Sequence, residues 1–157
     1  DILNKSTVPM VQSKFVGGIE SIALNGLGTV NSRLALVEAS SCTGLVIYTH
    51  GAGNGPFSNP ERTIVPVIER TIELGKPVLL TTSIYGGKVN PKLYEAGRKM
   101  EDAGGIPTFD MTPAAAEVKL AWSMGLPEFT TGGVNFIREI FNRDLVGEKG
   151  NPDLVTR

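Results

Sequence analysis

The chain has 157 residues, of which 41% are hydrophobic and 20% are charged, and its formal net charge is −1. This length fits one domain with its own core, and this composition argues against a disordered chain. Because lysines and arginines are scattered along the chain and the net charge is small, we expect no binding to nucleic acid or to an anionic membrane.

The chain contains one cysteine, Cys42, and one histidine, His50. An intramolecular disulfide is therefore impossible, and a zinc site of cysteines and histidines cannot be assembled. No apolar run reaches the ~18–20 residues that a membrane span requires. The sequence starts at Asp1 without a signal-peptide pattern, so we expect a fragment, a processed product or part of a larger polypeptide. Together these features favour a reducing cytoplasm.

The first half of the chain predicts two strands and two helices. Alternating apolar residues over Met10–Val16 predict a strand, and the pattern of Asn31–Ser41 predicts a helix. Gly44–Tyr48 is a short apolar run typical of a strand that is buried on both faces. Capping residues at Ser58–Glu61 then open a helix that we expect to end at Gly75.

The second half predicts two more strands and three helices. Pro77–Thr82 is a second buried strand, and a helix follows from Asn90-Pro91 to Gly104-Gly105. Ile106–Phe109 predicts a short strand. We expect this strand at the edge of the sheet, because its proline has no N–H group to donate to a neighbouring strand. Pro113 begins the next helix, which Gly125 stops. The last helix carries one apolar face, formed by Val134, Ile137, Ile140 and Phe141.

The helix that Pro113 begins contains residues whose environments we predict separately. We expect Lys119 to be solvated, and we expect Val118, Ala121 and Trp122 to belong to the core.

Alternation of strands and helices predicts an α/β fold: a three-layer sandwich with a small, mostly parallel sheet of about four strands and helices on both faces. We expect this domain over residues 10–148. Residues 1–9 resemble a linker or arm, and residues 149–157 resemble a flexible tail.

Ligands of open α/β sheets bind outside the carboxyl ends of the strands. Three loops leave those ends here: Thr49–Asn59, Thr81–Asn90 and Asp110–Pro113. We expect the fold to bring them to one rim, where each runs into a helix N-terminus that favours a carboxylate or phosphate.

The first of these loops holds the candidate ligand-binding residues Gly53, Asn54 and Gly55. Its glycines allow the backbone to approach a ligand closely, and Asn54 offers an amide to hold one. The alternative is that the glycines only make a tight strand-to-helix turn, since such a loop is a weak signal. Thr82 and Ser83, at the end of the next strand, either bind a polar ligand or satisfy local backbone groups.

His50 precedes the glycine-rich loop. As a general base it would need Ser58, Thr82 or Ser83 within reach, and no G-x-S-x-G elbow supports a hydrolase triad. A structural role for this loop histidine is the simpler interpretation.

An ordered set of motifs resembles a known family. In chain order the motifs are G-A-G-N-G-P (51–56), K-P-V-L-L-T-T-S (76–83), G-K-V-N (87–90), Y-E-A-G (94–97), A-G-G-I-P (103–107), D-M-T-P (110–113) and V-K-L-A-W (118–122). Over Val11–Glu148 the chain looks like the C-terminal domain of bacterial-type L-asparaginases, a domain that the D subunit of the archaeal tRNA-dependent glutamine amidotransferase shares. Pro56 makes the cytoplasmic type I branch the closer one, because the periplasmic branch typically has a second Asn there.

The resemblance implies hydrolysis of the asparagine side-chain amide to aspartate and ammonia through a Thr-linked acyl intermediate, without metal or cofactor. In this family the nucleophile lies in an N-terminal domain that the present sequence does not contain. We therefore expect no catalytic residue in this chain and no activity of the chain alone. Its expected partners are an N-terminal asparaginase domain or a second subunit, in a homo-oligomer.

Cytoplasmic members can also bind asparagine allosterically, and the resemblance places the loop asparagine of that site at Asn54. Two other positions depart from the family pattern: Tyr48 stands where the family has an arginine, and Ile84 where it has a cysteine. Loss of the arginine removes a bidentate carboxylate clamp.

Two alternatives from other classes remain at this point. One is a non-catalytic structural or self-assembling protein derived from this domain, which would expose an apolar face. The other is a module that binds an amino acid.

Overall fold

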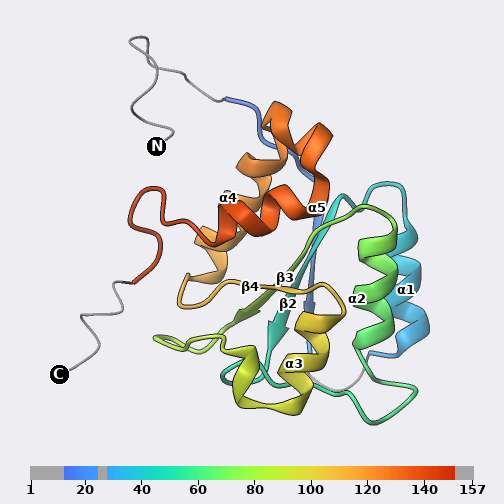
Figure 1. Cartoon of the computed structure of the whole chain (residues 1–157). Coiled ribbons are helices and arrows are strands. Elements are labelled where there is room, and N and C mark those ends of the chain that lie inside the picture. Colours follow the sequence, from blue (N-terminus) through green and yellow to red (C-terminus); the bar gives the residue numbers. More distant parts are fainter. Residues whose placement is uncertain (1–12, 25–27, 151–157) are drawn as a thin grey trace, which may run out of the picture.

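Four parallel strands form one sheet in the computed structural model, in the spatial order β1-β2-β3-β4 (Figure 1). The structure describes residues 13–24 and 28–150. The strands are β1 (Ile19–Ala23), β2 (Gly44–Thr49), β3 (Val78–Thr82) and β4 (Ile106–Pro107). This confirms the predicted α/β fold, and β4 lies at the edge as its proline predicts.

Helices cover both faces of the sheet. They are α1 (Val30–Glu38), α2 (Val65–Glu73), α3 (Glu95–Asp102), α4 (Pro113–Met124) and α5 (Pro127–Phe141), with a 3₁₀ turn at Pro91–Leu93. One face carries α1, α2 and α3, and the other carries α4 and α5 (Figure 1). The result is the three-layer sandwich that alternating strands and helices predict.

The two central strands contribute buried residues to both cores. Leu45 and Ile47 of β2 pack with α1–α3, whereas Val46 packs with α4 and α5, because successive side chains of a strand point to opposite faces. Every residue of β3 is likewise buried. A strand covered on both faces reads as a continuous apolar run, which is why the sequence locates β2 and β3 correctly.

The first strand lies later in the chain than predicted. Residues 13–16 of the predicted strand Met10–Val16 are not in a strand, and residues 10–12 lie outside the described residues. β1 instead pairs with β2 from Ile19↔Gly44 to Ala23↔Tyr48. Only Ile22 of this edge strand is buried, so its apolar pattern is weak in the sequence. The N–H of Val16 donates to the carbonyl of Ala121 in α4, 3.0 Å away.

Two helices begin later than the capping signals predict. The segment Ser58–Glu61 lies in a turn in which the Asn59 carbonyl accepts from the N–H groups of Arg62 and Thr63, at 3.0 and 2.8 Å. Helix α2 then starts at Val65. Asn90 caps only the short 3₁₀ turn, so α3 starts at Glu95. Asn59 and Asn90 both accept hydrogen bonds from nearby N–H groups, but these groups belong to turns that precede the two helices.

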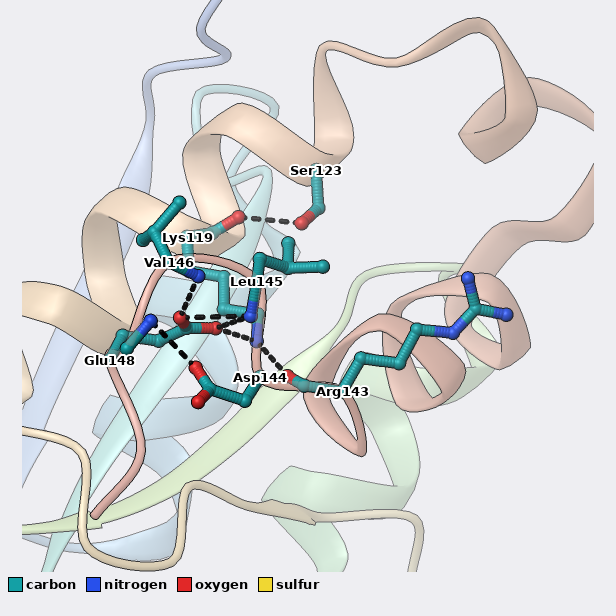
Figure 2. Close-up of polar contacts among 8 residues, drawn as sticks. Lys119, Ser123, Arg143, Asp144, Leu145, Val146 and Glu148 are labelled. Atoms are coloured by element: carbon teal, nitrogen blue, oxygen red, sulfur yellow. Dashed lines mark hydrogen bonds and ion pairs between the residues drawn. The ribbon is translucent and has the colours of Figure 1, made fainter. Parts of the chain in front are cut away.

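Helix α4 corrects two predicted environments. Val118, predicted to be core, is 59% exposed, and Lys119, predicted to be solvated, is only 7% exposed. Lys119 Nζ forms an ion pair with the carboxylate of Glu148 and donates to the carbonyl of Arg143 at 2.6 Å (Figure 2). The partners come from the segment after α5, which folds back over α4 and covers this lysine.

Candidate functional site

Hydrogen bonds join the three loops at the carboxyl edge of the sheet. The N–H of Asn90, from the loop after β3, donates to the carbonyl of Ala52 in the loop after β2, at 2.8 Å. One residue earlier, the N–H of Val89 donates to the carbonyl of Phe109 after β4, also at 2.8 Å. The predicted convergence of these loops is therefore confirmed.

The loop after β2 is a tight turn closed by its own backbone. His50 and Asn54 exchange N–H···O=C hydrogen bonds of 2.8 Å in both directions, as an isolated antiparallel bridge. Gly53 has φ +111°, a conformation that glycine adopts far more readily than other residues. The Oδ1 atom of Asn54 accepts from the N–H of Gly55 at 2.9 Å, which leaves the Nδ2 group of this exposed side chain as a donor.

Neighbouring protein atoms occupy the space beside the two candidate glycines. A Cβ atom at Gly55 would lie 2.7 Å from Cδ1 of Leu24, and one at Gly53 would lie 3.3 Å from Cγ1 of Val89. The close packing at Gly55 and the positive φ of Gly53 agree with the alternative that these glycines serve the turn. Their contact with a ligand remains a prediction.

Thr82 and Ser83 differ in exposure. Thr82 is 3% exposed, and its Oγ1 atom accepts from the N–H of Ile84 at 3.3 Å. Ser83 is exposed. Neither residue lines the cavity beside Asn54 that is described next. Thr82 ends β3 and Ser83 follows it, next to the end of β2, and their contact with a ligand remains a prediction.

A cavity of about 450 Å³ lies beside the Gly-rich loop. Its lining consists of Leu24, Arg33, His50, Asn54, Gly55, Pro56 and Arg62. Two of these residues, Arg33 and Arg62, carry guanidinium groups, and the lining contains no acidic residue among the described part of the chain. No sequence motif points to either arginine, because one lies on α1 and the other in the turn before α2.

Arg33 is buried without a carboxylate partner. It is 6% exposed, and its Nη1 donates to the carbonyl of Arg62 at 3.1 Å. Over residues 13–24 and 28–150, no ion pair involves either arginine. Burial lowers the pKa of Arg33 from its ordinary value, which reflects the cost of holding a charge away from water.

Tyr48, at the family's arginine position, points to another layer. Its hydroxyl donates to Oε1 of Glu117 in α4 at 2.8 Å. Burial and then this hydrogen-bonded carboxylate raise the pKa of Tyr48. The Tyr48 hydroxyl is therefore hydrogen-bonded on the α4 side of the sheet. It does not take the place of the family's arginine beside Asn54.

Large apolar side chains are exposed on the loops that follow β3 and β4. They are Ile84 (55% exposed), Tyr85 (103%), Leu93 (59%), Tyr94 (46%) and Phe109 (38%). We call these five residues the edge patch. Phe109 also has φ +57°, a conformation that costs a bulky residue energy. Exposed apolar side chains that gather on one surface are typical of a contact with another protein.

In the described part of the chain, no three His, Cys, Asp or Glu side chains are placed to hold a metal ion. None of the helices in residues 13–24 and 28–150 is long and apolar enough to cross a bilayer.

The fold and its loops define an α/β domain with a candidate ligand-binding rim and an exposed apolar patch on the same sheet edge. The model of the Glutaminase/Asparaginase C-terminal domain matches residues 22–135, which include the three edge loops. The chain belongs to this family.

Relatives in sequence are longer than this chain. It is 38% identical over 102 residues to the D subunit of the Glutamyl-tRNA(Gln) amidotransferase of Aeropyrum pernix, covering 65% of this chain and 22% of that protein. It is 36% identical over 110 residues to an L-asparaginase of Thermococcus kodakarensis, covering 70% of this chain and 31% of that protein. The chain thus spans less than a third of these two relatives.

Solved structures agree with the sequence relatives. The thermostable L-asparaginase from Thermococcus kodakarensis superposes with a TM-score of 0.75 at 30% identity, covering 88% of this chain and 39% of that chain. L-asparaginase I from Vibrio cholerae gives a TM-score of 0.77 at 26% identity, covering 90% and 40% respectively. In both cases the match is to a part of a larger protein.

Proposed function

We propose that this chain is the C-terminal domain of an L-asparaginase-type amidohydrolase, which converts asparagine to aspartate and ammonia. The observation that carries the proposal is the joining of the three loops, all within the matched residues 22–135, at one edge with exposed polar and apolar groups. The reactive hydroxyl belongs to an N-terminal domain of this enzyme type. This chain supplies no catalytic residue, and its contribution is the rim that faces the ligand.

The candidate ligand-binding residues of this rim have different roles. Asn54 Nδ2 and the Ser83 hydroxyl are exposed and act as polar contacts to the ligand. Thr82 is buried and orients the start of the following loop through its hydrogen bond to Ile84. Gly53 and Gly55 allow the turn that presents Asn54.

The edge patch is the proposed contact with the rest of the enzyme. Tyr85 is fully exposed in the domain alone, and burying such aromatic side chains is favourable at an interface. The partner is the N-terminal domain, of the same or of a neighbouring subunit, in a cytoplasmic homo-oligomer. Family membership and the position of the patch beside the Gly-rich loop support this assignment.

Reconstitution tests the proposal. This domain is mixed with a separately prepared N-terminal L-asparaginase domain, and ammonia release from asparagine is measured for the mixture and for each part. We expect activity only in the mixture. Tyr85→Ser should reduce it at least tenfold at limiting domain concentration, since a central aromatic contact is worth about 2 kcal/mol or more.

A matched control is Val118→Ser, because Val118 is 59% exposed on α4 and lies outside the edge patch. It should leave the activity of the mixture unchanged. Absence of ammonia release in the mixture, at domain concentrations that give a complex, would contradict the proposal.

The edge patch also supports a second candidate, a non-catalytic protein that assembles through this face. An exposed apolar surface on a single domain favours association with a second copy. Light scattering distinguishes the two: self-association that Tyr85→Ser abolishes, without reconstituted activity, favours the second candidate. A monomer over the whole concentration range contradicts it.

A further inference from the structure

The cavity beside the Gly-rich loop combines a buried cation with hydrogen-bond donors. Arg33 lines it from α1, and Arg62 lines it from the turn before α2. Hydrogen bonds hold these parts together: the Val30 N–H donates to the Glu61 carbonyl at 2.9 Å, and Arg33 donates to the Arg62 carbonyl at 3.1 Å.

The charge of this cavity is not balanced within the described residues. A buried cation normally has an anionic partner, because removal from water is costly for a charged group. The Lys119 amine of this same domain has such a partner in Glu148. Arg33, at 6% exposure, has a hydrogen bond to one backbone carbonyl and no ion pair among the residues that the structure describes.

We propose that the cavity binds a small organic oxyanion, a carboxylate or a phosphate ester, whose negative group contacts Arg33 and Arg62. A guanidinium presents N–H donors in the planar arrangement that suits both kinds of oxyanion. The proposal does not rest on amidohydrolase activity and concerns binding by this chain alone.

The size and the remaining walls of the cavity favour an organic ligand over a bare ion. Its volume of about 450 Å³ lies in the range of small-molecule sites, which is roughly 300–1,000 Å³. Leu24 and Pro56 provide apolar wall beside the charged groups. A ligand with one oxyanion and a small apolar body therefore matches the lining.

The single histidine allows a direct measurement, because His50 lines the cavity and its imidazole proton signals cannot be confused with another residue's. The full chain is titrated with benzoate, phenyl phosphate and neutral benzamide in a buffer without phosphate or carboxylate, and the His50 Hε1 signal is followed by NMR. We expect a saturable shift with at least one of the two anions and none with benzamide. The anion that binds more tightly identifies the oxyanion as carboxylate or phosphate.

Variants separate this site from general charge effects. Arg62→Gln, at an exposed position, should weaken anion binding about tenfold, since a hydrogen bond to a charged group contributes about 1.5 kcal/mol or more. Arg33→Met should weaken it at least as much. Arg143→Gln is the matched control, because this exposed side chain extends from the end of α5 away from its neighbours, and it should bind like the unaltered chain (Figure 2).

Three results would overturn the proposal: no saturable shift with either anion at tens of millimolar, equal binding of benzamide, or equal weakening by Arg62→Gln and Arg143→Gln. None of them bears on the reconstitution experiment, which measures ammonia release and not anion binding. Failure of this proposal and failure of the proposed function are therefore distinguishable.

Discussion

Two buried cations of this domain, Lys119 and Arg33, have opposite environments. Lys119 contacts the Glu148 carboxylate and the Arg143 carbonyl, and its Nζ lies 5.3 Å from the centre of the Phe141 ring. The Arg33 guanidinium donates to one backbone carbonyl, that of Arg62, and Arg33 lines the cavity. A fully partnered buried charge holds parts of a fold together, whereas one with spare donors beside a cavity is suited to bind something else.

The Lys119 environment also explains how the end of the domain is held. The Glu148 carboxylate accepts from the N–H groups of Leu145 and Val146 as well as from Lys119, with the closest backbone distance being 2.8 Å (Figure 2). Burial alone would raise the pKa of Glu148, but the hydrogen bonds from Lys119 and these backbone donors outweigh it and hold this pKa well below its usual range.

The largest effect should come from breaking the Lys119–Glu148 pair. Glu148→Gln should lower the free energy of unfolding by about 3 kcal/mol, because it leaves the ammonium group buried without a carboxylate. Urea unfolding followed by circular dichroism measures this loss. Glu38→Gln, which breaks the exposed pair with Arg70, should cost about 0.5 kcal/mol or less. Equal costs for the two variants would show that burial does not strengthen the pair.

The same pair should give an acid-dependent stability. Because the folded-state pKa of Glu148 lies below the unfolded-state value of about 4.3, its stabilisation is complete above that pH and is lost as the pH falls further. Below about pH 4, the unaltered chain should lose up to about 1.4 kcal/mol per pH unit more than Glu148→Gln. Urea unfolding at several pH values between roughly 3 and 6, which spans the unfolded-state pKa, tests this. Parallel curves for the two proteins would contradict the depressed pKa.

Removing the other cation should have a much smaller effect than breaking the Lys119–Glu148 pair. Arg33→Met should change the free energy of unfolding by less than about 1 kcal/mol, because an apolar side chain of similar length avoids the cost of burying a charge that lacks an anionic partner. Urea unfolding at neutral pH in a buffer without oxyanions gives the value. A loss as large as that of Glu148→Gln would make Arg33 a structural residue and would remove the contrast between the two cations.

The contrast also shows where sequence reasoning succeeds. The sequence locates strands β2 and β3 correctly because burial on both faces makes them continuous apolar runs. The helix signals around α4 are equally local: Pro113 begins this helix and Gly125 follows its last residue, as predicted. One segment of the chain contains all the information that such signals need.

The misses depend on residues that are distant in the chain. The prediction of a solvated Lys119 is wrong because its helix carries no information about Glu148, which lies 29 residues later. The two arginines of the cavity meet only after α1 packs beside the turn that precedes α2. Edge strand β1 buries one residue, so its position depends on pairing with β2 more than on its own pattern. The ligand contacts of Asn54, Thr82 and Ser83 stay predictions.

The Gly-rich loop is fixed from two directions. Its ends pair through His50 and Asn54, and the Ala52 carbonyl accepts from the N–H of Asn90. Helix α3 also approaches so closely that a Cβ atom at Gly97 would lie 2.9 Å from the Gly53 carbonyl oxygen. A molecule that docks against Asn54 therefore meets a preorganised surface, and its affinity is not reduced by the entropy of ordering a mobile segment.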